Sequence, residues 1–291
     1  MAQVAIDRQM TLVCWEHMYW WDGVERTHVF ERNNEMAGYC GVQHALELMG
    51  QDGAFGPQKS AAVIGYGSVS RGALAALNGH GFRDITVYTR RPVDHISHRM
   101  LGIQYRRLLR NKAGSYDIQD ESGCLIPFSA VLSKRDVIVN GTLQNPRHPD
   151  LFLSLDDIDR FHRPCLIVDV SCSKSMGFSF ASPTSFEAPF MEFGNITYYA
   201  VDHTPSLLWD AASYEISQAL VSFLPDLIAK NENQTIAQAK DIREGEILNP
   251  AIIDFQHRES SYPYIVQRIS DQRDTSTNPD INRKGSLPRP H

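Results

Sequence analysis

A glycine turn between an apolar run and a helical pattern is the strongest candidate for a chemical site in this sequence. Residues 61–64 are apolar, Gly65-Tyr66-Gly67 follows them, and residues 68–77 carry the apolar periodicity of a helix. Glycine lets the backbone approach a ligand closely, and the first turn of a helix presents N–H groups at a positive dipole end. The pattern therefore predicts a pyrophosphate site. The residues expected to contact the dinucleotide there are Gly65, Gly67, Ser68 and Val69.

The surroundings of this turn support the dinucleotide interpretation more than the pattern itself does. Ser70 stands where the usual G-x-G-x-x-G pattern has its third glycine, and such a pattern alone is weak evidence. A second apolar run at 85–88 ends about 20 residues after the turn, as a dinucleotide fold requires. A purely structural turn is the alternative.

The residues after this second run indicate which dinucleotide binds. Thr89, Arg90 and Arg91 stand where enzymes that prefer NAD usually carry an acidic residue for the ribose hydroxyls. A guanidinium group suits the 2′-phosphate of NADP, and no carboxylate is present to repel it. The sequence predicts NADPH as the cofactor, with contacts from these three residues. The alternative is that the arginines only solvate the end of a loop.

Four apolar runs would supply the strands that hold these groups: 61–64, 85–88, 137–139 and 166–170. The last two lack the polar alternation of a half-exposed strand, so we expect burial on both faces. Helical stretches separate the runs, which is typical of an α/β fold with a doubly wound parallel sheet of the Rossmann type. Thr142 and Leu143, which follow the third run by three and four residues, are further expected cofactor contacts.

Composition favours small-molecule chemistry. A chain of 291 residues that is 42% hydrophobic can bury a sizeable core, and a net charge of −6 creates no field that favours nucleic acid or an anionic membrane. The five cysteines are odd in number and lack C-x-x-C spacing, which indicates a reducing, cytoplasmic environment. We recognise no Cys/His grouping of the zinc type among the eleven histidines, so no metal site is expected.

Three segments together resemble the alanine dehydrogenase and pyridine-nucleotide transhydrogenase superfamily. They are residues 33–38, the glycine turn, and the pair formed by 168–172 and 201–208. Within that superfamily the last two of these segments most resemble the N5-(carboxyethyl)ornithine synthases and, more distantly, the lysine-forming saccharopine dehydrogenases. The similarity extends over residues 5–260. It implies NADPH-dependent reduction of an imine formed between a 2-oxo acid and an amino group of a basic amino acid.

The resemblance also implies site residues. Positions that line the nicotinamide and the substrate in the family correspond to Asp202, His203, Thr204, Pro205 and Ser206. Glu16 matches a carboxylate near the substrate in the saccharopine enzymes, and Asn34 matches a residue that contacts the cofactor.

His203 and Asp202 suit the implied reaction. Hydride addition to a C=N bond needs a protonated nitrogen, and histidine titrates near neutral pH. Asp202 could hold the tautomer of His203 or attract the cationic nitrogen, and Glu16 could bind a substrate ammonium group. The alternative is that Asp202 only caps the next helix and His203 is a hydrogen-bonded structural histidine.

The residue pattern predicts the remaining elements. We expect a short strand at 11–15, a helix capped at Asn33 and Asn34, and a basic helix near 100–111. A long, well-packed helix should follow with Thr204 as its cap and Pro205 as its first residue, and then a small helical or hairpin extension at 229–268. The resemblance adds a reduced, discontinuous second domain. The expected divisions are a substrate-domain remnant with a linking helix at 1–50, a dinucleotide-binding domain at 51–203, a long helix with an extension on the substrate side at 204–268, and a disordered tail at 269–291.

The chain departs from these relatives in two places. Ser173 stands where the family has an aspartate that contributes to catalysis or substrate orientation. The family also has more substrate domain before the segment that matches Thr11, including a lysine and a histidine of the active site. We therefore expect a homo-oligomer, a fragment of a longer reading frame, or a rebuilt, shorter substrate domain.

Three functions remain open from the sequence. The first is an NADPH-dependent oxidoreductase that reduces an imine, either formed from an amino acid and a 2-oxo acid or cyclic. The second is a non-catalytic NADP-binding relative with a role in regulation or assembly. The third is an amino-acid dehydrogenase, which Arg90 and Arg91 disfavour because such enzymes more often use NAD.

Overall fold

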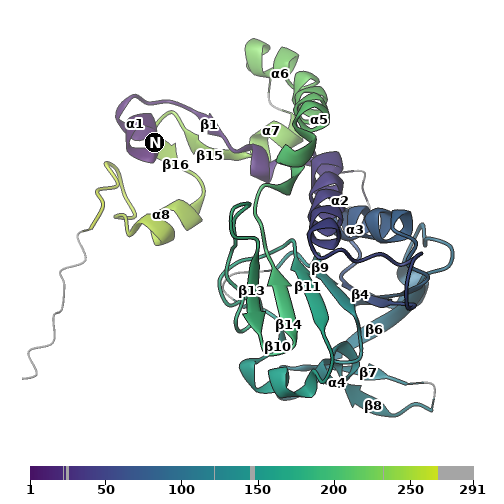
Figure 1. Ribbon diagram of the computed structural model, residues 1–291. Coiled ribbons are helices and arrows are strands. Elements are labelled where there is room, and N and C mark those ends of the chain that lie inside the picture. Colours follow the sequence, from purple (N-terminus) through teal and green to yellow (C-terminus); the bar gives the residue numbers. More distant parts are fainter. Residues whose placement is uncertain (22, 24–25, 121, 145–147, 232, 268–291) are drawn as a thin grey trace, which may run out of the picture. The chain divides into compact units, whose positions relative to one another are not determined.

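The computed structural model describes residues 1–21, 23, 26–120, 122–144, 148–231 and 233–267. The chain forms two compact units (Figure 1): Tyr19–Glu232 is the larger, and Met1–Met18 together with Asn233–His291 is the smaller. The divisions expected at 50 and 203 remain predictions. The expected tail at 269–291 lies outside the described residues.

A nine-stranded sheet forms the centre of the larger unit. Its six parallel strands are, in order across the sheet, β6 (Gln104–Arg110), β5 (Asp84–Thr89), β4 (Ser60–Ile64), β9 (Val137–Asn140), β11 (Cys165–Asp169) and β14 (Ile196–Tyr199). At one edge β13 (Phe190–Phe193) pairs antiparallel with β14. At the other edge the antiparallel strands β7 (Tyr116–Gln119) and β8 (Leu125–Pro127) follow β6.

The order of these strands confirms the expected Rossmann-type fold. From β4 the chain proceeds outward through β5 and β6, and then returns to the other side of β4 for β9, β11 and β14. The order reverses between β4 and β9, and the carboxyl ends of strands at such a switch point form the usual ligand crevice. Every residue of β9 and β11 is buried, as expected for strands covered on both faces.

Alternate residues of the strands pack into two hydrophobic cores, one on each face of the sheet. One contains Ala61, Val63 and Val139 together with residues of α2 (Glu31–Leu48) and α3 (Ser68–Gly79). The other contains Ala62, Ile138 and aromatic residues from elements that cover the opposite face. Those elements are α4 (Phe128–Leu132), β10 (Leu151–Leu153), η3 (Leu155–Arg160) and β12 (Gly177–Phe178). The larger unit also contains the hairpin of β2 (Tyr19–Trp21) and β3 (Arg26–His28), and η2 (Val93–His95).

Helices α2 and α3 approach each other backbone to backbone. A Cβ atom on Gly72 would overlap the Glu35 carbonyl group, because it would lie 2.6 Å from the carbonyl carbon. A Cβ atom on Gly38 would overlap the Val69 carbonyl group in the same way. The two glycines therefore allow the crossing that fixes α3, and with it the glycine turn, against α2.

Two expected elements differ in the structure. The prediction of a helix near 100–111 is wrong. This segment forms β6, which pairs with β5 on one side and with β7 on the other. Asn33 and Asn34 do not cap α2, since the helix begins at Glu31 with Phe30 as its N-cap residue.

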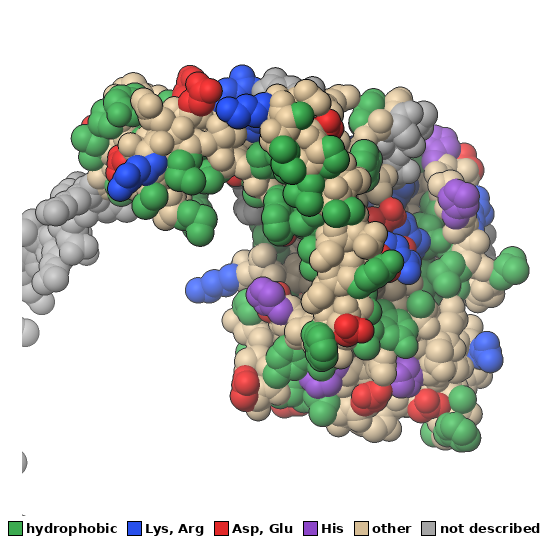
Figure 2. Space-filling view, turned by 90° about the horizontal axis from the view of Figure 1, so that it is seen from above, with side chains coloured by type: hydrophobic (Ala, Val, Ile, Leu, Met, Phe, Trp, Pro, Cys, Tyr) green, Lys and Arg blue, Asp and Glu red, His purple; other side chains and the backbone are tan. Residues whose placement is uncertain are grey.

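The helical stretch after β14 consists of η4 (Thr204–Leu208), α5 (Trp209–Val221) and α6 (Leu224–Ala229). The expectation that it is well packed is wrong for most of its length. Only Ala212 of α5 is buried, and Ile228 of α6 is 81% exposed. Figure 2, which looks down on α5 and α6 of Figure 1, shows apolar side chains gathered at the surface. The exposed apolar residues of the stretch include Leu208, Trp209, Tyr214, Val221, Leu224, Leu227 and Ile228.

The smaller unit joins both ends of the chain in a three-stranded sheet of order β1-β15-β16. Its elements are α1 (Ala2–Asp7), β1 (Leu12–Val13), η1 (Trp15–His17), α7 (Gln234–Gln238), β15 (Lys240–Arg243), β16 (Glu246–Ile247) and α8 (Pro250–Gln256). Ile6, Ile242 and Tyr264 lie in its core. The strand expected at 11–15 is shorter than predicted, because β1 covers only Leu12–Val13 and Trp15 begins η1. The helical or hairpin extension expected at 229–268 contains both kinds of element, the helices α7 and α8 and the antiparallel pair β15–β16. Among the described helices of the chain, none has the length and apolarity to cross a bilayer.

Candidate functional site

The glycine turn lies at the carboxyl end of β4 and leads directly into α3. Gly65 has φ +93°, a conformation that side chains rarely adopt, and its N–H donates to the Tyr88 carbonyl oxygen at 2.8 Å. A Cβ atom on Gly67, the N-cap residue of α3, would meet no described atom within 4 Å. No described side chain caps the helix. The turn thus combines open space with a helix N-terminus, which is the arrangement that a pyrophosphate needs.

Ser70 replaces the third glycine without disturbing this arrangement. Its side chain is fully buried, and a Cβ atom on Gly141 would lie 2.6 Å from its Oγ. The absence of a side chain at Gly141 makes room for the serine. The third glycine of the usual pattern permits close helix–strand packing, and here the pair Ser70–Gly141 provides that fit.

A buried polar chain connects the glycine turn to the neighbouring strands. The Thr142 hydroxyl donates to the Ile64 carbonyl oxygen at 3.1 Å, and its N–H donates to Asn140 Oδ1 at 3.2 Å. The Asn140 amide donates to Asp169 Oδ1 at 2.9 Å, and the Tyr198 hydroxyl donates to Asp169 Oδ2 at 2.8 Å. These contacts fix the loop of Thr142, a residue expected to contact cofactor, against the turn. The expected contact Leu143, by contrast, is largely exposed.

Asn140 and Asp169 were not predicted to belong to the site. The available signal was that each is a polar residue at the last position of an apolar strand. Burial raises the pKa of Asp169 to about 7, although the hydrogen bonds from Tyr198 and Asn140 oppose the rise.

Replacing Asp169 with asparagine is expected to remove a pH dependence of stability. The carboxyl pKa rises from 3.8 to about 7 on folding, so the folded protein holds an extra proton between these values. The extra proton stabilises the folded protein fully below pH 3.8, and this stabilisation is lost as the pH rises through about 7. Between these values the free energy of unfolding falls by up to about 1.4 kcal/mol per pH unit. Urea unfolding between pH 4 and pH 7 measures this pH dependence. If the free energy of unfolding changes equally with pH in wild type and in Asp169→Asn, the pKa of Asp169 is not raised in the folded protein.

The two arginines after β5 are held by specific partners. Arg90 Nη1 lies 2.7 Å from Oδ2 of the buried Asp150, whose other oxygen accepts the Tyr116 hydroxyl at 2.6 Å. Arg91 Nη2 donates to the Tyr66 carbonyl oxygen at 2.7 Å. Since Tyr66 lies between the two glycines of the turn, Arg91 brings a positive charge to the predicted cofactor site. The side chain of Arg90 is still 54% exposed.

A pocket of about 360 Å³ opens at the carboxyl ends of β11 and β14, within the range of small-molecule sites. It contains two of the predicted catalytic residues, Asp202 and His203, and two of the residues predicted to line the nicotinamide, Thr204 and Ser206. Its lining residues are Asn33, Ala37, Val170, Val201, Asp202, His203, Thr204, Pro205, Ser206, Ala212 and Ile216. Ala37 of α2 lines the pocket while the adjacent Gly38 contacts the start of α3, so α2 connects the pocket to the glycine turn.

Asp202 and His203 form a pair at the rim of this pocket. His203 Nδ1 lies 3.0 Å from Asp202 Oδ2, and the His203 N–H donates to Asp202 Oδ1 at 2.8 Å. His203 has φ +57°, which is uncommon for a residue with a side chain and is often found at functional sites. Asp202 therefore orients the imidazole through Nδ1, which leaves Nε2 as the nitrogen that can exchange a proton.

Thr204 was expected to be the cap residue of the next helix, and this prediction is wrong. His203 is the N-cap residue of η4, and Thr204 lies inside the element with Pro205. The Thr204 hydroxyl donates to the Ala37 carbonyl oxygen at 3.0 Å. This contact ties η4 to α2 beside the pocket.

Asn33 is a site residue that was not predicted, although its neighbour Asn34 was expected to contact the cofactor. Asn33 lines the pocket, and its buried Oδ1 accepts no hydrogen bond from the described residues. A buried polar atom without a partner is uncommon in a folded protein and suits a ligand contact. Asn34 is not among the lining residues, so its contact with cofactor remains a prediction.

Two residues discussed from the sequence lie outside this pocket. Ser173 is exposed and is not a lining residue. Glu16 belongs to η1 of the smaller unit, and its proposed role toward the substrate remains a prediction.

Comparisons with known proteins agree with this geometry. Residues 57–251 match the family model described as alanine dehydrogenase/PNT, C-terminal domain. The chain is 25% identical over 214 residues to the N(5)-(carboxyethyl)ornithine synthase of Clostridium botulinum, covering 70% of this chain and 56% of that protein. It is 24% identical over 217 residues to the enzyme of the same name from Lactococcus lactis subsp. lactis, covering 75% and 58%. The chain thus spans little more than half the length of these relatives.

Two solved structures share the fold. An L-alanine dehydrogenase gives a TM-score of 0.64 at 14% identity, covering 87% of this chain and 70% of that chain. The transhydrogenase from Sinorhizobium meliloti gives 0.64 at 17% identity, covering 85% and 71%.

Proposed function

Because the chain belongs to the alanine dehydrogenase/PNT C-terminal domain family, we propose that it is an NADPH-dependent oxidoreductase that reduces the C=N bond of an imine derived from an amino acid. The family resemblance inferred from sequence segments is confirmed. The observation that carries the proposal is the pocket, in which the Asp202–His203 pair lies beside the carboxyl ends of β11 and β14. Helix α2 connects it to the glycine turn.

The glycine turn fits the pyrophosphate of the cofactor. Gly67 leaves open space, and the uncapped start of α3 presents N–H groups there. Ser68 and Val69 open that helix, and Thr142 is fixed beside it. When bound, NADPH would supply the hydride. The unpartnered Oδ1 of Asn33 and the residues Thr204 and Ser206 would line the nicotinamide end.

His203 would act as the proton donor of this reaction. Its imidazolium Nε2–H would give a proton to the imine nitrogen, which makes the adjoining carbon a better hydride acceptor. Asp202 would hold Nδ1–H and stabilise the imidazolium ion before the transfer.

Turnover with candidate substrates tests the proposal. NADPH mixed with the protein, a 2-oxo acid such as pyruvate and a panel of amino acids should lose its nicotinamide absorbance. If the protein binds NADPH and no mixture is reduced, the second candidate function, a non-catalytic nucleotide-binding module, would replace the first. Reduction with ammonium in place of every amino acid would favour the third, an amino-acid dehydrogenase.

The preference for NADPH is expected to depend on Arg90 and Arg91. Each could pair with a 2′-phosphate, and a charge-assisted hydrogen bond contributes about 1.5–3 kcal/mol. Arg90→Gln and Arg91→Gln should therefore lower NADPH affinity about 10- to 100-fold with little effect on NADH. Isothermal titration with both nucleotides measures the difference.

Arg160→Gln is the matched control for these variants, because it also breaks an arginine–aspartate pair, that with Asp157 on η3. If the Arg90 and Arg91 variants weaken both nucleotides equally, the arginines support the fold of the site and do not select the cofactor.

We further propose that a second copy of the chain covers the exposed apolar face of α5 and α6. Apolar surface of this kind usually marks a contact. A molar mass in light scattering that equals one chain would contradict this.

A further inference from the structure

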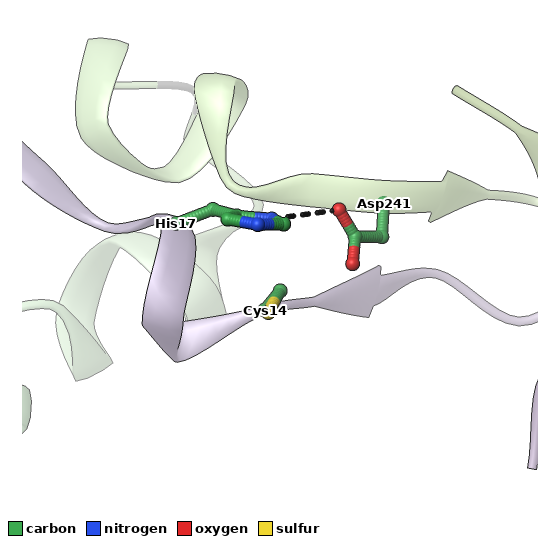
Figure 3. Close-up of side chains that lie close together, drawn as sticks. All are labelled: Cys14, His17 and Asp241. Carbon is green, nitrogen blue, oxygen red and sulfur yellow. Dashed lines mark hydrogen bonds and ion pairs between the residues drawn. The ribbon is translucent and has the colours of Figure 1, made fainter. Parts of the chain in front are cut away.

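A second group of chemically active side chains lies in the smaller unit, outside the pocket. Figure 3 shows Cys14 and His17 beside Asp241 of β15. One atom from each, the cysteine sulfur, an imidazole nitrogen and a carboxylate oxygen, lie within 4.8 Å of one another. His17 Nδ1 is already 3.0 Å from Asp241 Oδ1, although 224 residues separate the two in the sequence.

The local backbone brings these groups together. Cys14 directly precedes η1, and the short helical turn places His17, three residues later, on the same side. The Cys14 N–H donates to the Ala239 carbonyl oxygen at 2.7 Å, which fastens this turn to the segment that leads into β15. The Asn249 amide donates to the same oxygen, Asp241 Oδ1, at 2.9 Å and orients the carboxylate.

The charges near the sulfur favour a cation. The carboxylates of Asp241 and Glu16 both act on the Cys14 sulfur and would attract a positive ion. A bound cation would release the thiol proton, as metal binding generally does for cysteine.

We propose that Cys14, His17 and Asp241 bind a divalent transition-metal ion, with Zn²⁺ as the best match to one sulfur, one nitrogen and one oxygen ligand. Zn²⁺ accepts all three ligand types in tetrahedral sites, in which ligand atoms lie about 3.3–3.8 Å apart. Small side-chain rotations would bring the present separations into that range. Since the His17 side chain is 44% exposed, water can fill the fourth position. The ion would hold the segment of Cys14 and His17 against β15.

This site was not expected from the sequence. Cys14 and His17 supply only two ligands in one stretch of sequence. The third ligand comes from the far end of the chain, and only folding shows it.

Cobalt binding to the full-length, chelator-treated protein tests the proposal. One equivalent of Co²⁺ should produce a thiolate-to-cobalt charge-transfer band, and Zn²⁺ should displace the cobalt and remove the band. Cys14→Ser should abolish the band. His17→Gln and Asp241→Asn should weaken binding by at least about 100-fold, since even residues that only support a ligand contribute 10- to 100-fold.

Cys124→Ser is the control, because Cys124 is an exposed cysteine of the larger unit. This variant should keep the full band. Zn²⁺ should also raise the melting temperature of wild type and of Cys124→Ser but not that of Cys14→Ser. The absence of a thiolate band in wild type, or its persistence in Cys14→Ser, would overturn the proposal, since the metal would then bind elsewhere or not at all.

Discussion

His203→Asn is expected to lower the rate of imine reduction by about 10²- to 10⁴-fold and to leave NADPH affinity unchanged. This is the usual range for the loss of a general acid. Asparagine is the appropriate replacement, because it tolerates the left-handed backbone that His203 adopts at φ +57° and cannot donate a proton at neutral pH. The side chain is largely exposed at the pocket rim, so its loss should not unfold the protein. Single-turnover kinetics with saturating NADPH measures the effect.

His257→Asn provides a matched control. His257 also adopts a left-handed conformation, with φ +50°, at the end of α8 in the smaller unit. This variant should retain the wild-type rate. If His203→Asn also retains it, His203 is not the proton donor, and the pair with Asp202 is structural. The pH–rate profile of Asp202→Asn distinguishes two roles of Asp202. The profile should shift if Asp202 orients His203, and it should stay unchanged if Asp202 only caps the helix.

Gly72→Ala is expected to destabilise the larger unit by at least about 3 kcal/mol, at the upper end of the effects of overpacking. The added Cβ would overlap the Glu35 carbonyl group, and backbone cannot rotate away as a side chain can. Separation of α2 from α3 would also shift the glycine turn, so NADPH affinity should fall together with stability. Urea unfolding followed by circular dichroism gives the free energy of unfolding.

Gly79→Ala tests whether the effect comes from the helix crossing. Gly79 lies at the other end of α3, and a Cβ atom there would meet nothing within 4 Å. Since alanine favours helix over glycine, this variant should be neutral or slightly more stable. If both variants unfold alike, close packing between α2 and α3 is not the reason for glycine at position 72.

The parts of the fold that follow from local pattern were predictable. The glycine turn joins a strand and a helix that are adjacent in sequence, so residues 61–77 contain the whole signal. The runs that became β9 and β11 are buried on both faces, and continuous apolarity identifies such strands. The clustering of Asp202 to Ser206 was also expected, because these residues follow one strand directly.

The parts that depend on distant partners were not predictable. The segment of β6 has basic and apolar residues that suit a helix, and pairing with β5 and β7 decides otherwise. Asn33 and Asn34 are adjacent residues of α2 and therefore lie on different faces of the helix. Only Asn33 lines the pocket, and the packing of α2 decides which face points there. The hydrogen bonds of Asp169 come from Asn140 of β9 and Tyr198 of β14, so they depend on three strands that are separate in the sequence.

The central claim is that a pyridine nucleotide binds across the glycine turn, and Gly67→Ala tests it most directly. Gly67 has φ −107°, an extended conformation open to alanine, and a Cβ atom there would touch no described atom. The substitution should therefore leave the melting temperature unchanged and obstruct only a ligand. Titration of NADPH by its nicotinamide fluorescence should show one site in wild type and an affinity lower by at least about tenfold in Gly67→Ala. Equal affinity in the two proteins, or no binding to wild type, would contradict it.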